Sequence, residues 1–223
     1  MRLLTYNVRS LRDDASAVAR VIRSARADVV CVQEAPRFVA WRSKCARLAR
    51  RAGLVIVGGG RAAGANLLLA SAAIDVLATR DVILSRRRGY HRRGVAMAVL
   101  RLDGSVFAVA GTHLDGLPDQ VDEVHDALDD FAGGVAAIVA GDINAEPGGA
   151  AWTALAARGA DAFAVAGSGD GFTSNVTALT RRIDAIFAGA PSVVHDAVVI
   201  DGADVRVASD HLPMLAVLEL PAG

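Results

Sequence analysis

The sequence predicts an α/β (α+β) fold of mixed β-sheets with helices on the outside, and three observations support this. Short segments rich in Val, Ile, Leu and Ala are typical of buried strands. Some of these segments are separated by helical patterns and others by short turns, and strands connected in both ways form mixed sheets. With 53% hydrophobic and 22% charged residues, the chain can bury a sizeable core. No break in composition divides the sequence, so we expect a single domain over residues 1–223.

The first part of the chain is expected to alternate strands and helices. Residues 2–7 and 29–34 are apolar strands, and Asp13 or Asp14 can cap a helix between them. Pro36 stops the second strand. The residues that follow repeat at helical spacing and are interpreted as core contacts: Phe38, Trp41, Cys45, Leu48 and Ala52.

Glycines are concentrated between the next two predicted strands, at residues 54–57 and 66–71. We interpret the glycines at positions 58–60 and 64 as a flexible connection. A phosphate-binding loop is disfavoured there, because no Gly-Lys-Ser/Thr sequence and no helix follow.

The rest of the chain combines a hairpin with further strands and helices. Asp103-Gly104 joins two apolar segments, at residues 95–101 and 105–110, and predicts a hairpin that leads to His113. The next segment has one apolar and one acidic face, as a surface helix packed on a sheet does; its apolar residues are Val121, Val124, Leu128 and Phe131. The remaining expected elements are a strand that ends at Gly141, a helix near residues 150–158, and strands at 183–188, 193–200 and 214–220.

Charge is balanced over the whole chain but uneven along it. The 24 Lys and Arg offset the 24 Asp and Glu, which excludes a strong overall attraction to nucleic acid or anionic membranes. Residues 85–94 are nevertheless strongly basic, whereas residues 115–130 carry seven acids and no Lys or Arg. Clustered arginines can bind phosphates through paired hydrogen bonds, so Arg92 and Arg93 are candidate substrate phosphate contacts. A solvated loop is an equally good interpretation of this basic stretch.

Cysteine use and the N-terminus bear on the cellular compartment. Cys31 and Cys45 are the two cysteines, and we interpret both as free core thiols, because neither belongs to a zinc-binding pattern. The chain opens directly on a strand, and no apolar run reaches the length of a membrane span. We therefore expect a cytoplasmic protein with no membrane span, and we favour a monomer.

Polar side chains follow several of the predicted buried strands. Asp142 and Asn144 come directly after the strand that ends at Gly141, and in an extended chain they point the same way. An Asp/Asn turn is the better interpretation of this pair taken alone. The pattern recurs, however, at Asn7, Gln33-Glu34, Thr112-His113, Ile183-Asp184 and Ser209-Asp210-His211. Repeated strand ends with one functional group each are how α/β enzymes assemble a site from distant residues.

These polar segments resemble the motifs of the endonuclease/exonuclease/phosphatase superfamily. That group contains DNase I-like nucleases, exonuclease III-type repair nucleases, inositol polyphosphate 5-phosphatases and bacterial sphingomyelinases. The motifs occur in order along the chain as Thr5-Tyr6-Asn7, Gln33-Glu34, Thr112-His113-Leu114, Gly141-Asp142-Ile143-Asn144, Arg182-Ile183-Asp184 and Ser209-Asp210-His211. The resemblance implies a DNase I-like four-layer α/β/β/α sandwich with a site at one edge of its two mixed sheets. In one departure, the helix after His113 lacks the arginine that many members carry there.

The resemblance also implies hydrolysis of a phosphoester by water with a divalent metal, Mg²⁺ or alternatively Mn²⁺. Glu34, Asn7 and Asp210 are the expected metal ligands, because hard dications prefer oxygen donors. Asp142 is expected to orient and deprotonate the attacking water, and Asn144 to hold that water or a phosphoryl oxygen.

Two histidines are expected to act on the phosphate. By the same resemblance, Asp184 holds His211 in its cationic form, because a neighbouring carboxylate raises the pKa of an imidazole. His113 is expected to donate a hydrogen bond to a phosphoryl oxygen or to the leaving group.

The leading hypothesis from sequence is a Mg²⁺-dependent phosphoesterase that acts on a phosphodiester or a phosphomonoester. Its rivals are a DNA nuclease of the exonuclease III or DNase I kind, a small-molecule or lipid-headgroup phosphoesterase, and a catalytically silent binding module. An aromatic content of 4% and zero net charge argue against a broad nucleic-acid groove, whereas the arginine cluster favours a polyanion. The complete set of polar motif residues argues against a silent module.

Overall fold

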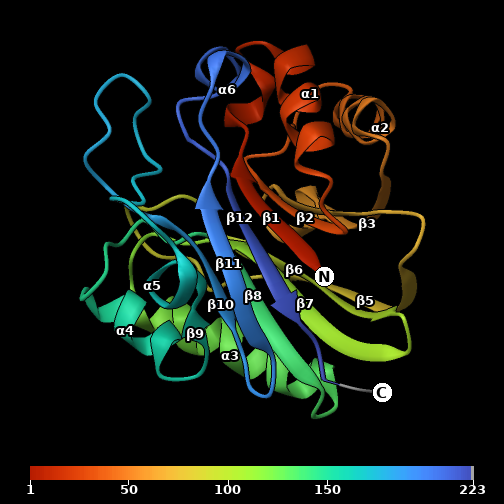
Figure 1. Ribbon diagram of the computed structural model, residues 1–223, viewed down its shortest axis with the longest axis vertical. Helices are drawn as coiled ribbons and strands as arrows, with labels where there is room; N and C mark the ends of the chain where they lie inside the picture. Colours follow the sequence, from red (N-terminus) through yellow and green to blue (C-terminus); the bar gives the residue numbers. More distant parts are fainter. Residues whose placement is uncertain (222–223) are drawn as a thin grey trace.

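Two six-stranded β-sheets pack face to face in the computed structural model, which describes residues 1–221. Helices cover both outer faces (Figure 1), so the expected four-layer sandwich is confirmed. The first sheet contains, in spatial order, β11 (Val193–Val199), β12 (Met214–Glu219), β1 (Arg2–Asn7), β2 (Val29–Gln33), β4 (Asn66–Ala70) and β3 (Val55–Gly60). The second contains β5 (Asp75–Ile83), β6 (Gly94–Leu102), β7 (Ser105–His113), β8 (Ala136–Asp142), β10 (Asp184–Ala188) and β9 (Ala160–Asp161).

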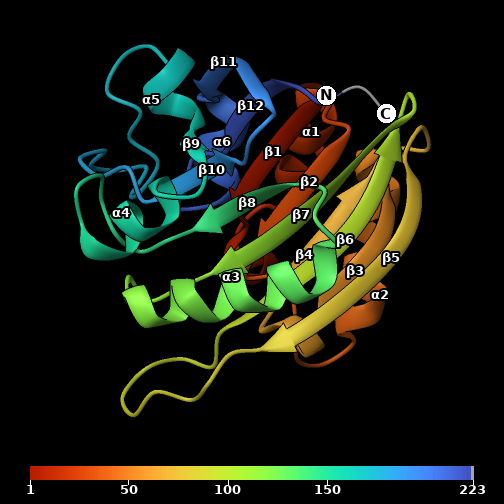
Figure 2. The ribbon, with the colours of Figure 1, turned by 90° about the horizontal axis from the view of Figure 1, so that it is seen from below.

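The helices divide between the two outer layers. The apolar residues of α1 (Ala15–Ala25), α2 (Trp41–Ala52) and α6 (Ala203–Ala208) pack on the first sheet. Those of α3 (Pro118–Ala132) and α4 (Ala150–Ala156) pack on the second, where α3 runs along the sheet (Figure 2). The short α5 (Ala162–Ala166) contacts β10 and β11 at the end of the sandwich.

Each sheet contains one parallel strand pair at its centre, and this determines where the polar motifs lie. β1 is parallel to β2, with Asn7 in register with Gln33. β7 is parallel to β8, with His113 in register with Asp142. Because parallel strands end at the same edge, both pairs deliver their polar ends to one side of the molecule. Apolar side chains of the two sheets pack against each other in the interior of the sandwich. This packing holds the two parallel strand pairs side by side.

Several sequence expectations agree with the structure. Asp14 caps α1 by accepting hydrogen bonds from Ser16 N and Ala17 N at 2.8 and 3.0 Å. The Asp103-Gly104 hairpin joins β6 to β7. Both cysteines are free and buried. None of the helices in residues 1–221 has the length and hydrophobicity needed to traverse a bilayer.

Two local expectations are wrong, and one strand was not expected. Gly58 to Gly60 belong to β3 and pair with β4, so they do not form a flexible connection. The edge strand β5 has no counterpart in the sequence prediction, because its mostly exposed residues leave no burial pattern. Phe38 precedes α2 and is 75% exposed, so it is not a core contact.

Candidate active site

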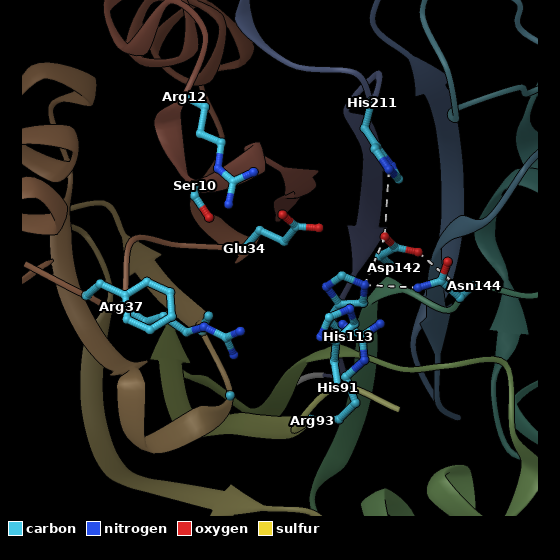
Figure 3. A pocket seen from close by; sticks show the side chains of 13 residues that line it. Ser10, Arg12, Glu34, Arg37, His91, Arg93, His113, Asp142, Asn144 and His211 are labelled. Atoms are coloured by element: carbon cyan, nitrogen blue, oxygen red, sulfur yellow. Dashed lines mark hydrogen bonds and ion pairs between the residues drawn. The ribbon is translucent and has the colours of Figure 1, made fainter. Parts of the chain in front are cut away.

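A cavity of about 420 Å³ opens where the two parallel strand pairs end. Its walls come from both sheets: Glu34 from the first faces Asp142, Asn144 and His113 from the second (Figure 3). His211, from the segment before β12, completes the wall that holds Asp142. Residues more than 170 positions apart in the chain therefore share one cavity.

Asp142 lies at the centre of this wall. Its Oδ2 accepts a 3.0 Å hydrogen bond from Asn7 Nδ2 and lies 3.3 Å from His113 Nε2 and 3.8 Å from His211 Nε2. Burial raises the pKa of Asp142, and the neighbouring charge of Asp184 raises it further. A carboxylate with a raised pKa is a stronger base than an exposed one.

The backbone before Asp142 tolerates no side chain. A Cβ added at Gly141 would collide with the backbone oxygen of Thr112 on the adjacent β7. Glycine at this position therefore allows the close approach of β7 and β8 that brings His113 beside Asp142.

His211 and Asp184 form a buried pair beside Asp142. The Nδ1 of His211 lies 2.8 Å from Oδ2 of Asp184. Burial by itself would lower the pKa of His211, but the carboxylates of Asp184 and Asp142 outweigh it and raise this pKa to about 10. His211 is therefore cationic at neutral pH. Thr173 fixes the pair from behind, since its Oγ1 accepts hydrogen bonds from the backbone N–H groups of Ile183 and Asp184.

His113 has the opposite charge state. Burial, with help from the positive charges of Arg93 and His211, lowers its pKa to about 4, so the imidazole is neutral at pH 7. Asn144 Nδ2 lies 2.9 Å from His113 Nε2 and also donates to the backbone oxygen of Leu114. With Nε2 as acceptor of that bond, the proton of His113 is on Nδ1. Figure 3 shows this second ring nitrogen turned toward the cavity.

Two residues that face each other across the cavity share an unusual backbone conformation. Glu34, after β2, has φ 51°, and Asn144, after β8, has φ 55°. Both lie in the left-handed region, which is rarely adopted by residues other than glycine and is found most often where function requires it. Asn144 N also donates to Asp142 Oδ1 at 3.1 Å. The Asp/Asn turn considered from sequence thus exists, and it is part of the cavity wall.

Glu34 and Asn7 form the opposite side of the site. Asn7 Nδ2 donates to Glu34 Oε1 at 3.2 Å as well as to Asp142, while its Oδ1 accepts from Arg9 N–H at 3.1 Å. The amide nitrogen of Asn7, and not its oxygen, therefore faces the carboxylates. The carboxylate of Glu34 points across the cavity toward Asp142 (Figure 3).

Two groups of side chains have the chemistry to hold a divalent cation. Glu34 offers a half-buried carboxylate with free acceptor capacity, which suits an ion that keeps several of its waters. Asp142, Asp184 and His211 also have ligand atoms within 4.8 Å of one another. Ligation by His211 would require its neutral form, and the raised pKa of His211 opposes this. The donor chemistry therefore fits a cation better at Glu34.

The structure does not bring every predicted site residue into the cavity. Asp210 lines a neighbouring cavity and lies 3.3 Å from Arg9 Nε. Arg92 is exposed and does not line the cavity. Arg93 does line it, but its guanidinium lies 2.7 Å from Asp115.

Sequence reasoning missed seven residues that line the cavity: Ser10, Arg12, Arg37, Phe38, Gly64, Ala65 and His91. Ser10 and Arg12 follow Asn7 closely, and Arg37 follows Glu34, so their nearness to motif residues was the available signal. Ser10 projects from a turn, Arg9–Leu11, in which all three residues have positive φ. Nothing in the sequence distinguishes such a turn from an ordinary one.

Comparisons with known proteins agree on one family and one fold. Residues 4–211 match the sequence profile described as the Endonuclease/Exonuclease/phosphatase family. No curated protein is significantly similar in sequence to the chain. A solved endonuclease/exonuclease/phosphatase from Bacteroides vulgatus superimposes with a TM-score of 0.83 at 20% identity, over 99% of this chain and 98% of that one.

Two further solved structures share the fold. A mannosyl-6-phosphatase from Bacteroides thetaiotaomicron gives a TM-score of 0.83 at 17% identity, over 99% of this chain and 100% of that one. TDP2 from D. rerio, complexed with single strand DNA product, gives 0.78 at 18% identity, over 98% of both chains. At these identities the likeness establishes a common fold.

Proposed function

Because the chain belongs to the Endonuclease/Exonuclease/phosphatase family, we propose that it is a hydrolase that cleaves a phosphoester with the help of a divalent metal ion. One observation carries the proposal. A buried carboxylate, a cationic histidine and a neutral histidine line one wall of the cavity, and Glu34 faces them from the other wall. Attack on phosphorus needs a base for water, positive charge for the phosphoryl oxygens and help for the leaving oxygen.

In this proposal Asp142 orients the attacking water and accepts its proton. Asn7 donates to Oδ2 of Asp142 and limits its rotation. The raised pKa of Asp142 makes it a better proton acceptor than an exposed aspartate. Asn144 keeps its side-chain oxygen available for the water, because its amide nitrogen is already bonded to His113 and Leu114.

The two histidines act on the phosphate. His211, kept cationic by Asp184, offers a charged donor from Nε2 to a phosphoryl oxygen. His113 offers a neutral donor from Nδ1, toward a phosphoryl oxygen or the leaving oxygen. The two are therefore not interchangeable, since one supplies charge and the other a directed hydrogen bond.

We propose Glu34 as the main metal ligand, with Mg²⁺ as the ion and Mn²⁺ as the alternative. Such an ion neutralises phosphoryl charge and polarises the P–O bond. The ligands expected from sequence also include Asn7 and Asp210; Asn7 supports Glu34 by its hydrogen bond, and Asp210 would have to leave Arg9. We accordingly assign Asp210 at most a contact through water.

The substrate is proposed at the level of a phosphodiester or phosphomonoester. The similar structures include a phosphatase and a DNA-bound protein, which support both possibilities. Arg12 and Arg37 line the cavity and form no ion pair within residues 1–221, so they are free to meet an anionic substrate. A nuclease is the second candidate function.

The proposal is tested by assaying purified protein with Mg²⁺ and with EDTA. Bis(p-nitrophenyl) phosphate, p-nitrophenyl phosphate, supercoiled plasmid and abasic duplex represent the diester, monoester and nuclease alternatives. Asp142→Asn is the inactive control. Metal-dependent turnover that Asp142→Asn abolishes supports the proposal, and turnover of plasmid favours the nuclease. Absence of metal-dependent turnover on all four substrates would contradict it and favour a binding module.

A further inference from the structure

Positive charge is concentrated in the part of the chain that follows the Gln33-Glu34 motif. Residues 35–74 contain seven Lys and Arg and no Asp or Glu, although the whole chain is neutral. Five of the seven are on α2, and Arg37 precedes it. The zero net charge therefore conceals one strongly cationic surface.

The outer face of α2 is cationic throughout. Cys45, Leu48, Ala49 and Ala52 face the first sheet, whereas the exposed positions carry the charges; these are Arg42, Lys44, Arg47, Arg50 and Arg51. Within residues 1–221 none of the five forms an ion pair. On the adjacent α1, by contrast, Arg20 is paired with both Asp204 and Asp14.

A groove beside α2 borders the candidate active site at Ser10. Lys44, Arg47 and Arg51 are spaced i, i+3 and i+7, which places them along one side of the helix. They line a groove of about 210 Å³ together with Ser10 and the apolar side chains of Leu11, Ala15 and Leu48. Ser10 also lines the active-site cavity, so the two hollows share a wall. We call this feature the α2 groove.

We propose that the α2 groove binds the phosphate backbone of a single-stranded nucleic acid. Three unpaired cations along a concave surface match a chain of phosphates, because backbone charge dominates such binding. The 75% exposed ring of Phe38, at the mouth of the active-site cavity, offers a surface on which a base can stack. A flat bilayer does not fit a concave groove as well as a narrow strand does.

The location of the groove gives it a role in catalysis. Because Ser10 lines both hollows, a strand bound in the α2 groove that passed Ser10 would reach the cavity lined by Glu34 and Asp142. Entry of the strand into the active-site cavity as a substrate rests on the proposed function, whereas binding in the α2 groove does not. The substrate class it indicates is a polynucleotide held at several phosphates.

Binding is measured by fluorescence anisotropy with labelled oligothymidylate of about 20 nucleotides, long enough for one binding site. EDTA is present, so that turnover plays no part. The test variant is Lys44→Glu/Arg47→Glu. The matched control is Arg26→Glu/Arg101→Glu, which makes the same charge change on two exposed residues. Arg26 caps the C-terminus of α1 and Arg101 lies in β6, and neither lines the α2 groove or the active-site cavity. Circular dichroism and thermal melting verify that both variants fold.

We expect the α2 variant to weaken binding about tenfold or more at low salt, since it reverses two contacts. The slope of log K against log salt should fall by about 1.4, because each contact to a single strand contributes about 0.7. The control should bind within about twofold of wild type, since its charges lie outside the groove. Equal weakening in both variants, or no binding by the wild type, would overturn the proposal.

Two parallel measurements separate the remaining outcomes. If the α2 variant loses affinity for phosphatidylserine vesicles but not for the oligonucleotide, the surface is a membrane site and the proposal is wrong. Turnover of bis(p-nitrophenyl) phosphate with Mg²⁺ reports the proposed function alone, and both variants should retain it. Oligonucleotide binding that depends on α2 without any turnover would contradict the proposed function and leave this inference standing.

Discussion

Asn7 donates a 3.0 Å hydrogen bond from Nδ2 to Oδ2 of Asp142, and this bond joins β1 of one sheet to β8 of the other. The same amide group bonds Glu34. The proposed water-activating residue and the proposed metal ligand are therefore held by one side chain. Ser209 Oγ in turn donates to the backbone oxygen of Asn7 at 2.7 Å, which ties the segment carrying His211 to the same point.

Replacing either of the two central residues should abolish most activity. We expect Asp142→Ala and His211→Ala each to lower kcat by roughly a hundredfold or more, because each removes a proton acceptor or a charge contact at the phosphate. His195→Ala is the matched control, since this exposed histidine pairs with Glu219 on the far strands of the first sheet. Steady-state kinetics on bis(p-nitrophenyl) phosphate provide the measurement. A variant with near-normal kcat would remove its residue from the mechanism.

The role of Glu34 can be distinguished from that of Asp142 by the Mg²⁺ concentration that activity requires in each variant. Glu34→Gln keeps the hydrogen-bonding shape but removes the charge that a hard dication prefers. We expect the Mg²⁺ concentration at half-maximal activity to rise, with partial recovery of the rate at high Mg²⁺. Titration of activity against Mg²⁺ for wild type and variant tests this. An unchanged titration midpoint would refute Glu34 as a ligand.

His113 should make stability depend on pH in a predictable direction. In the folded protein its pKa is about 4, whereas an unfolded histidine has its pKa near 6.5. The unfolded chain therefore binds a proton first, and folding loses free energy as pH falls from 6.5 to 4, in total about 3 kcal/mol. Urea denaturation of wild type and His113→Asn across this range, with EDTA, isolates the contribution. If the two proteins show parallel pH dependence, the pKa of His113 is not lowered by folding.

A buried ion pair behind the site offers a test of stability. Arg182 forms two hydrogen bonds to Asp161, at 2.8 and 2.9 Å, and lies over the rings of Trp152 and Phe163. Asp161→Asn leaves the Arg182 charge buried and unpaired, so we expect a loss of about 3 kcal/mol or more. Arg182→Met combined with Asp161→Asn should cost less than the sum of the single changes. Denaturant unfolding of wild type, the two single variants and the double variant measures the coupling free energy between Arg182 and Asp161. If the losses of the single variants add up to the loss of the double variant, the two residues are not coupled.

The two oppositely charged stretches show what charge patterns along a sequence can and cannot predict. The sequence shows where the two stretches lie along the chain, but only the fold shows that their residues form ion pairs with each other. Arg87 of the basic loop pairs with Asp119 and Glu123 of α3, and Arg93 pairs with Asp115. The basic loop is thus partly neutralised, whereas none of the five cations of the acid-free α2 has an ion-pair partner within residues 1–221. Sequence order does not reveal which charges will be neighbours.

Local chemistry was sufficient to predict much of this protein. Apolar runs predicted the central strands, Asp13 or Asp14 a helix cap, Asp103-Gly104 a hairpin, and the polar strand ends a common site. Some of these features depend only on residues adjacent in the chain, and the common site depends on the rule that parallel strands end at the same edge of a sheet. Local patterns and the order of the strands along the sequence are sufficient to predict them.

Tertiary structure alone decided the rest. The left-handed backbone of Glu34 and Asn144, the direction of the Asn7 amide, the pairing of Asp210 with Arg9 and the exposure of Phe38 all depend on atoms far away in the sequence. The physical reason is that backbone strain, side-chain orientation and desolvation are determined by which surfaces pack together. The sequence therefore predicted some of the side chains that meet at the cavity, such as Asp142 and His211, but not others, such as Arg12. Packing of the two sheets determined the charge and direction of each.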